Sequence, residues 1–254
     1  MWYNFLRMQA KPAFLLKYIR GKLGLNHTRT KIKVAIDGPA GAGKSSVAKM
    51  TAEKLGYVYV DTGAMYRAIT WYILDLNLTF NDHQGIQSLL DHIDLTLKPT
   101  EAGQEVWING QNVTSLIRSP LINQYVSHVA QMSNVRQFLT DIQKKMASNG
   151  GIIMDGRDIG TVVMPDAQLK IYLTASVQER ARRRYVEMKA AGNEQELGQL
   201  MEDISERDRM DEQREVSPLR QAEDAIYLDC SKLSMHQVVD AIVELSISKI
   251  NEAG

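Results

Sequence analysis

One stretch of this 254-residue chain decides its fold: Gly38-Pro39-Ala40-Gly41-Ala42-Gly43-Lys44-Ser45. It matches the pattern G-x-x-x-x-G-K-[ST] at every fixed position. Its glycines let the backbone turn so that successive N–H groups point inward at a phosphate, and the helix that follows adds the partial positive charge of its N-terminus. In this pattern Lys44 reaches the β- and γ-phosphates, and the hydroxyl group of Ser45 is a ligand of Mg²⁺. The sequence therefore predicts a site for a nucleoside triphosphate.

The segments on either side of this loop have the patterns of a strand and a helix. Residues 32–36 are apolar apart from one lysine, as expected of a strand buried on both faces of a parallel sheet. Residues 46–55 place apolar side chains at helical spacing and are followed by Gly56, which ends the predicted helix. Because strand, loop and helix follow in order, a glycine-rich turn without function is the weaker interpretation.

The composition is that of a globular protein with balanced charge. The chain has 30 Lys and Arg against 30 Asp and Glu, and 44% of its residues are apolar. A surface built to hold nucleic acid needs a basic excess, so no nucleic-acid partner is expected for the chain as a whole. No uninterrupted apolar run approaches the roughly 20 residues that cross a bilayer. The single cysteine, Cys230, cannot form an internal disulfide, so we expect a cytoplasmic protein.

The basic charge is concentrated at the N-terminus. Residues 1–36 carry eight basic side chains and no acidic one, so the other 218 residues have a net charge of −8. Apolar residues recur at helical spacing within an extension at 1–30, which predicts a basic amphipathic helix interrupted near Pro12. Two interpretations stay open. The extension contacts an anionic membrane surface or RNA phosphates, or it is a loosely docked tail without a partner.

Two further strands end in residues that suit phosphate chemistry. Residues 57–60 predict a strand, and Arg67 lies on the first turns of the helix after it, at the sheet edge where α/β proteins bind ligands. Residues 151–154 predict another strand, which ends at Asp155. An acidic residue at this place is a usual ligand of Mg²⁺, often through water, in phosphate-loop enzymes. Asp155 therefore joins Ser45 as a candidate metal ligand.

A glycine-flanked loop after this strand carries Arg157 and Asp158. The guanidinium group of Arg157 offers planar donors to a phosphate, and the carboxylate of Asp158 can accept from an amino group. The alternative is a turn whose aspartate and glycine serve backbone geometry only.

A cluster of arginines follows the predicted strand at 169–173. Arg180, Arg183 and Arg184 are related by i, i+3 and i+4, so their guanidinium groups are expected on one helical face. A phosphoryl group in transfer is an anion that such a cluster stabilises. The alternative is that nearby glutamates and solvent screen the three charges.

A second charged helix is predicted beyond this cluster. Arg207, Asp211 and Arg214 lie at i, i+4 and i+7 on one face, where surface ion pairs alone contribute only about 0.3–0.5 kcal/mol each. The polar stretch 189–194 separates the two helices. Charged helices joined by such a turn, over about residues 180–214, predict a lid that folds over phosphates and excludes water.

The region between the second and third strands predicts a small antiparallel sheet at about residues 86–120. Apolar and polar residues alternate there, and Asn109-Gly110 is a strong hairpin signal. Residues 120–148 follow as a predicted helix.

Several segments together resemble the bacterial cytidylate kinases, which are nucleoside monophosphate kinases. The resemblance covers about residues 31–250 and excludes the N-terminal extension, which the family usually lacks. It rests on IDGPAGAGKS at 36–45, DTGAMYR at 61–67, DGRDIGTVVMPDA at 155–167 and the charged run at 206–214. The resemblance implies an α/β, three-layer P-loop kinase fold: a kinase domain at 31–254 with a parallel central sheet, an antiparallel insert in the monophosphate-binding region and a helical lid.

The resemblance also implies an activity and residue roles. It implies transfer of the γ-phosphoryl group of ATP to CMP or dCMP with Mg²⁺, and we expect a monomer. The implied ATP contacts are Gly38, Pro39, Ala40, Gly41, Ala42, Gly43, Lys44, Ser45 and Ser46. The implied catalytic residues are Lys44, Arg157, Arg180, Arg183 and Arg184. The implied monophosphate contacts are Thr62, Tyr66, Arg67, Ser127, Arg136, Arg157, Asp158, Arg207, Asp211 and Arg214.

Cytosine presents an N4 amino donor beside acceptors at N3 and O2. Asp158 can accept from N4 while Arg136 and Ser127 donate to N3 or O2, a pattern that uracil mismatches. Buried partners left unpaired are costly, so discrimination between bases can be large. Two other functions stay open: a kinase of the same architecture for UMP or AMP, and a nucleotide-gated switch whose basic tail binds RNA or membrane. A switch needs no second nucleotide site, so the acceptor-site arginines argue against it.

Overall fold

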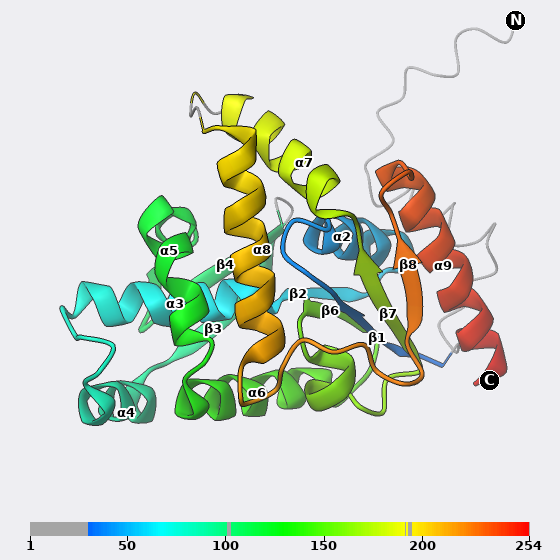
Figure 1. Ribbon diagram of the computed structural model, residues 1–254. Coiled ribbons are helices and arrows are strands. Elements are labelled where there is room, and N and C mark those ends of the chain that lie inside the picture. Colours follow the sequence, from blue (N-terminus) through cyan, green and yellow to red (C-terminus); the bar gives the residue numbers. More distant parts are fainter. Residues whose placement is uncertain (1–29, 101–102, 191, 193–194, 254) are drawn as a thin grey trace, which may run out of the picture.

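A parallel sheet lies at the centre of the molecule (Figure 1). The structure is a computed structural model that describes residues 30–100, 103–190, 192 and 195–253. Within these ranges the sheet has the strand order β2-β6-β1-β7-β8, and all neighbouring strands are parallel. The strands are β1 (Lys33–Asp37), β2 (Val58–Asp61), β6 (Ile152–Gly156), β7 (Leu169–Thr174) and β8 (Ile226–Asp229).

Helices cover both faces of this sheet. On one face, Val34 and Ile36 of β1 pack with helices α2 (Lys44–Leu55) and α9 (Met235–Glu252). On the other face, Ala35 belongs to a larger core that includes α3 (Thr62–Asp75). Successive side chains of a strand point to opposite faces, so the apolar run of β1 contributes to both cores. The predicted three-layer α/β fold is confirmed.

A small antiparallel sheet lies beside this core. It is preceded by α4 (His83–His92), so the first residues of the predicted insert are helical and not part of its sheet. Asn109 and Gly110 form the predicted hairpin turn, with φ values of 48° and 80°. Both values lie in the left-handed region that this turn requires and that Asn and Gly tolerate best. The sheet contains β3 (Leu95–Thr100), β4 (Gly103–Ile108) and β5 (Gln111–Asn112), and the helical turn η1 (Leu116–Arg118) follows.

The predicted helix at 120–148 is interrupted near residue 131. Two helices occupy this region, α5 (Pro120–Val129) and α6 (Ser133–Ala147). The side chain of Arg136 folds back to donate to the carbonyl oxygen of Ala130 at 3.0 Å, and this oxygen lies at the end of α5. Helical periodicity reveals neither this contact nor the break that it spans.

Two helices, α7 (Val177–Ala190) and α8 (Leu197–Gln213), form a hairpin above the sheet (Figure 1). Ala181, Leu200 and Ile204 form a small apolar core between them. These are the helices predicted as a lid. The predicted N-terminal extension lies outside the described residues except for Thr30. None of the helices in the described ranges is both long and apolar enough to cross a bilayer.

Candidate active site

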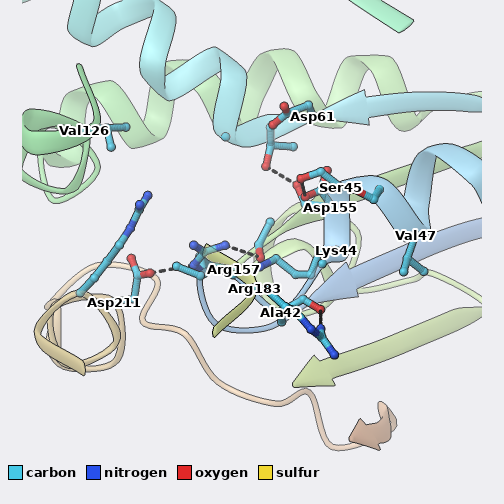
Figure 2. Close-up of a pocket in the computed structure, with 18 of the residues that line it drawn as sticks. Ala42, Lys44, Ser45, Val47, Asp61, Val126, Asp155, Arg157, Arg183 and Asp211 are labelled. Atoms are coloured by element: carbon cyan, nitrogen blue, oxygen red, sulfur yellow. Dashed lines mark hydrogen bonds and ion pairs between the residues drawn. The ribbon is translucent and has the colours of Figure 1, made fainter. Parts of the chain in front are cut away.

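A cavity of about 740 Å³ lies at the carboxyl ends of β1, β2 and β6 (Figure 2), and residues of α7 and α8 border it. This is the edge where parallel sheets bind ligands. The cavity is lined by residues from the P-loop, from α3, α5 and α6, from the loop after β6, from α7 and α8, and from the start of α9. Of the predicted site residues, these are Ala40, Gly41, Ala42, Gly43, Lys44, Ser45, Ser46, Thr62, Tyr66, Arg67, Ser127, Arg136, Asp155, Arg157, Asp158, Arg183, Arg207, Asp211 and Arg214.

The P-loop closes one side of the cavity. A Cβ atom at Gly38, where φ is 145°, would lie 1.9 Å from the carbonyl oxygen of Leu173, so the backbone admits only glycine there. The ammonium group of Lys44 is buried and donates to the carbonyl oxygen of Pro39 at 2.7 Å. Burial and, second, the charge of Arg157 lower the pKa of Lys44 to about 7. A bound polyphosphate would restore the favourable electrostatic partner that this ammonium group lacks.

Two protein oxygens of the candidate metal site already lie together. The hydroxyl group of Ser45 donates to one carboxylate oxygen of Asp155 at 2.8 Å, and the hydroxyl group of Tyr59 donates to the other at 2.9 Å. Burial and, second, the charge of Asp61 raise the pKa of Asp155 to about 6. The described residues contain no group of three or more His, Cys, Asp or Glu side chains that could hold a metal. Few protein ligands, all oxygen, suit Mg²⁺, which keeps several waters and binds substrate phosphates.

The opposite side of the cavity is an ion network that joins three elements. Arg157 donates through Nε to Asp211 of α8 at 2.7 Å. Arg136 of α6, only 2% exposed, donates to the carboxylate of Asp158, and Arg214 lies 3.8 Å from the same carboxylate. The structure thus brings together five residues that the resemblance assigned to monophosphate binding. The sequence separates Arg136, Asp158 and Arg214 widely, so only the fold makes them neighbours.

Several arginine nitrogens in this network have no hydrogen-bond partner in the described part of the chain. They are the Nε atoms of Arg67, Arg136 and Arg207 and one terminal nitrogen of Arg214, and all are buried. Burial and, second, the charge of Arg157 lower the pKa of Arg207 to about 10. Buried donors are nearly always satisfied in folded proteins. Unsatisfied cationic donors around one cavity therefore indicate an anionic ligand.

Three smaller side chains complete the acceptor side. The hydroxyl group of Thr62 donates to the backbone carbonyl of Asp155 at 2.6 Å, which ties α3 to β6. Tyr66 lies one helical turn further along the cavity wall, and the guanidinium carbon of Arg136 is 5.4 Å from the centroid of its ring. Ser127 lines the cavity from α5.

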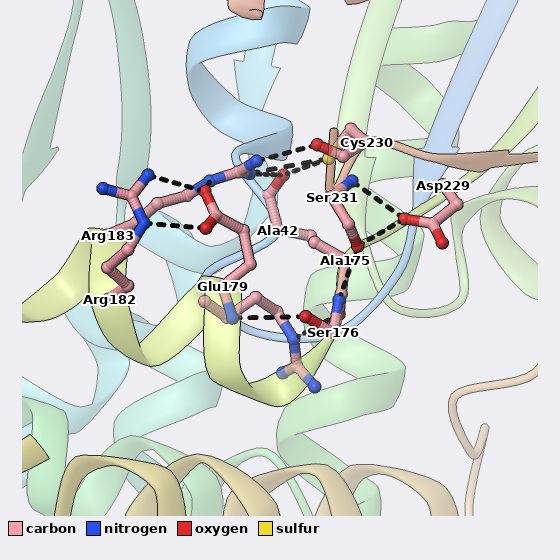
Figure 3. Close-up of polar contacts among 10 residues, drawn as sticks. Ala42, Ala175, Ser176, Glu179, Arg182, Arg183, Asp229, Cys230 and Ser231 are labelled. Atoms are coloured by element: carbon pink, nitrogen blue, oxygen red, sulfur yellow. Dashed lines mark hydrogen bonds and ion pairs between the residues drawn. The ribbon is translucent and has the colours of Figure 1, made fainter. Parts of the chain in front are cut away.

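The lid arginines differ from the predicted arrangement. Arg183 lines the cavity and is held by Glu179 at 2.9 Å and by the carbonyl oxygen of Cys230 at 2.8 Å (Figure 3). Its neighbour Arg182 also lines the cavity and pairs with Glu179. Arg184 does not line it, and lies 3.5 Å from Glu187 on the exposed side of α7.

Arg180 is buried beneath the cavity instead of facing it. It donates to the carbonyl oxygen of Ala40 in the P-loop at 3.0 Å and to Asp208 of α8 at 2.7 Å. With Arg180 held in these contacts, Arg182 shares the cavity with Arg183, and neither Arg180 nor Arg184 lines it. Spacing within α7 alone could not show this, because the partner lies 28 positions away.

Further lining residues were not among the predicted site residues. Asp61 caps α3 by accepting from the backbone of Ala64 at 2.8 Å, and it pairs with Arg67 at 3.0 Å. Arg118 of η1 lies 3.8 Å from the same carboxylate. The cavity also extends to an apolar end, lined by Val186 of α7 and by Leu233, Met235 and Val238 near the start of α9.

Sequence comparison agrees with this geometry. The family described as cytidylate kinase matches residues 34–248. The chain belongs to the cytidylate kinase family. The cytidylate kinase of Geobacillus sp. (strain WCH70) is 49% identical over 222 residues, which cover 87% of this chain and 99% of that protein. The cytidylate kinase of Bacillus subtilis (strain 168) is 49% identical over 214 residues, which cover 84% and 96%.

The resemblance inferred from the motifs is thus confirmed, and the match leaves residues 1–33 outside. Among solved structures, a shikimate kinase from Bacteroides thetaiotaomicron covers 85% of this chain and 98% of its own, with a TM-score of 0.42 and 14% identity.

Proposed function

We propose that this cytidylate kinase family member transfers the γ-phosphoryl group of ATP to CMP or dCMP, forming ADP and CDP or dCDP. One observation carries the proposal. A single cavity joins a P-loop to a second set of buried arginine nitrogens that have no hydrogen-bond partner among the described residues. Two anion sites that face each other suit direct transfer between two nucleotides, because in-line transfer needs donor and acceptor phosphates in contact.

The P-loop side is the site for ATP. Backbone N–H groups of the loop Gly38–Ser46, apart from Pro39, which has none, surround the β- and γ-phosphates, and Lys44 leaves the carbonyl of Pro39 to pair with them. The apolar end of the cavity, at Val186 and Met235, suits the base of this nucleotide.

The opposite side is the site for the monophosphate. Arg67, Arg157 and Arg207 surround its phosphate, and Asp211 lies within reach of its ribose. Asp158 accepts from N4 of cytosine while Arg136 and Ser127 donate to N3 or O2. Because Arg136 already holds Asp158, the base-reading pair is preorganised before substrate binds.

Chemistry in this arrangement is positioning plus charge stabilisation. Lys44, Arg157 and Arg183 line the space between the two sites, where negative charge spreads over the transferred oxygens. Arg180 acts indirectly, by fixing the P-loop against α8. Arg184 stays outside this set unless the lid rotates.

Ser45 and Asp155 would hold Mg²⁺, Asp155 through water, because their oxygens meet at the mouth of the P-loop. When bound, the ion neutralises charge on the phosphates. Tyr59 keeps the Asp155 carboxylate in place. The predicted monomeric state and cytoplasmic location remain predictions.

An ADP-release assay with Mg-ATP tests the activity. CMP and dCMP are expected to be better acceptors than UMP or AMP, and Lys44→Met is the inactive control because it removes the charge facing the phosphates. If AMP or UMP is phosphorylated at the same rate as CMP, the assignment of CMP as the acceptor is wrong. Release of ADP without any acceptor, at the same rate, would favour a nucleotide switch.

A further inference from the structure

Asp37 is a buried carboxylate that no part of the proposed mechanism uses. It ends β1, one residue before the P-loop, and is only 5% exposed. One of its oxygens accepts from the backbone N–H of Ile159 at 2.8 Å, and the other accepts from the N–H of Gly160 at 2.7 Å. These contacts join residues that are more than 120 positions apart in the sequence.

The two donors begin a single π-helical turn, η2 (Ile159–Val163). The first N–H groups of a helical turn have no partner within the turn and need an acceptor from elsewhere. The side chain of Asp158, the residue before η2, does not cap it. Asp37 therefore takes the role of the capping side chain, and it frees Asp158 to face the cavity with Arg136.

Fixing the start of η2 also fixes the backbone just before it. Arg157 and Asp158 lie in that backbone, directly between β6 and η2. The packing leaves little room for movement: a Cβ atom at Gly160 would lie 3.3 Å from the Asp37 carboxylate and 3.2 Å from Cδ of Lys170. The η2 end of the loop that carries the two acceptor-site residues is thus anchored by Asp37.

The charge of Asp37 has no ion-pair partner in the described ranges. Burial raises its pKa to about 6, while the two backbone donors lower it and the charge of Asp158 raises it further. Burying a carboxylate without a cation is costly. A neutral asparagine of the same shape cannot accept from both N–H groups, since its nitrogen only donates.

We infer that Asp37 is a positioning residue for the acceptor nucleotide: through Ile159 and Gly160 it sets Arg157 and Asp158, and thereby the affinity and selectivity for the pyrimidine monophosphate. The inference rests on the proposed function. Asp37 is also close enough to Lys44 to influence its charge, so a role on the ATP side is the competing explanation. The hydrogen bonds favour the acceptor side, because both go to η2 and neither goes to the P-loop.

Steady-state kinetics of Asp37→Asn separate the two explanations. We expect the KM for CMP to rise about tenfold, because one backbone N–H loses its acceptor, and the KM for ATP to stay within about twofold. The preference for CMP over UMP is expected to fall, since the position of Asp158 loosens. Ser246→Ala is the matched control: it removes one buried hydrogen bond, to the carbonyl of Ile242 in α9, and is expected to leave both KM values unchanged.

Gly160→Ala gives an independent test, because it keeps the Asp37 carboxylate. It also provides a result if the Asp37→Asn variant does not fold. Its added methyl group pushes on the same contact, so the same selective rise in the KM for CMP is expected. Two results in either folded variant would overturn the inference. One is a KM for ATP that rises as much as the KM for CMP, and the other is an unchanged KM for CMP. Wild-type protein that does not phosphorylate CMP would instead overturn the proposed function.

Discussion

At the scale of single residues, Asp158 has two tasks that cannot be separated. It accepts from Arg136 and lies 3.8 Å from Arg214, so one carboxylate compensates two buried guanidinium groups. The same carboxylate faces the cavity, where it is the acceptor proposed for the cytosine amino group. Substrate recognition and local stability therefore depend on one charge.

Asp158→Asn keeps the size of the side chain and removes this charge. We expect the KM for CMP to rise about 10- to 100-fold and the free energy of unfolding to fall by about 1–3 kcal/mol, because hydrogen bonds to charged groups are the strong ones. The KM for ATP should stay within about threefold, since the P-loop contacts are unchanged. Kinetics and urea denaturation measure the two effects. Asp141→Asn, an exposed change on α6, is the control.

If the Asp158→Asn variant still prefers CMP as strongly as the wild type does, Asp158 has no role in base recognition. An equal loss of ATP affinity would show that the substitution disturbs the whole site.

At the scale of elements, two arginines of α7, Arg180 and Arg183, attach the α7–α8 hairpin to carbonyl oxygens of the P-loop. Arg180, 4% exposed, donates to the P-loop carbonyl of Ala40 and to Asp208 of α8. Arg207 and Asp211 of the proposed acceptor site lie on that same helix. Binding at one nucleotide site can therefore influence the other through this contact.

Asp208→Asn weakens this link without touching the cavity. We expect the free energy of unfolding to fall by about 2 kcal/mol and the KM for ATP and CMP to rise together, each by about three- to tenfold, because α8 is less firmly held. Trypsin cleavage within the hairpin should also become faster. Asp203→Asn, on the exposed side of the same helix, is the matched control. A change in only one KM would argue against a link between the two sites.

The sequence predicts best the elements whose structure depends on a few neighbouring residues. The apolar run before Gly38, the loop itself and the Asn109-Gly110 turn each depend on a few adjacent residues, and all are found where expected. The break between α5 and α6 is different, because helical periodicity does not show it, and the side chain of Arg136 reaches back across it to Ala130. The contact of Arg180 with Asp208 likewise joins two helices and has no local signal in the sequence.

At the scale of the whole molecule, the site exists only where separate segments meet. Predicted residues such as Arg67, Asp155 and Asp211 carried their own local signals, at strand ends or in charged helices. Tyr59 looked like an ordinary strand residue, and Asp37, although part of the segment at 36–45, was given no role of its own. Their roles come from partners about 100 positions away, which no local pattern contains.

Asp37 also couples the stability of the whole molecule to pH. Its pKa rises from 3.8 to about 6 in the folded protein, so the folded state binds the proton more tightly than the unfolded state. Its contribution to stability is therefore largest at low pH and is lost as the pH rises through about 6. The charged or titratable groups that face it are Lys44 of α2, Asp158 before η2, and Lys170 and Tyr172 of β7.

Urea denaturation at pH 7 and pH 5, for wild type and Asp37→Asn, isolates this contribution. Between these pH values the wild type should gain about 1 kcal/mol of unfolding free energy relative to the variant, which cannot take up the proton. Other titrating groups, Asp155 among them, are present in both proteins and largely cancel in the difference. A difference that stays constant with pH would mean that the Asp37 carboxylate keeps an ordinary pKa, and a difference of opposite sign would mean that the fold lowers it.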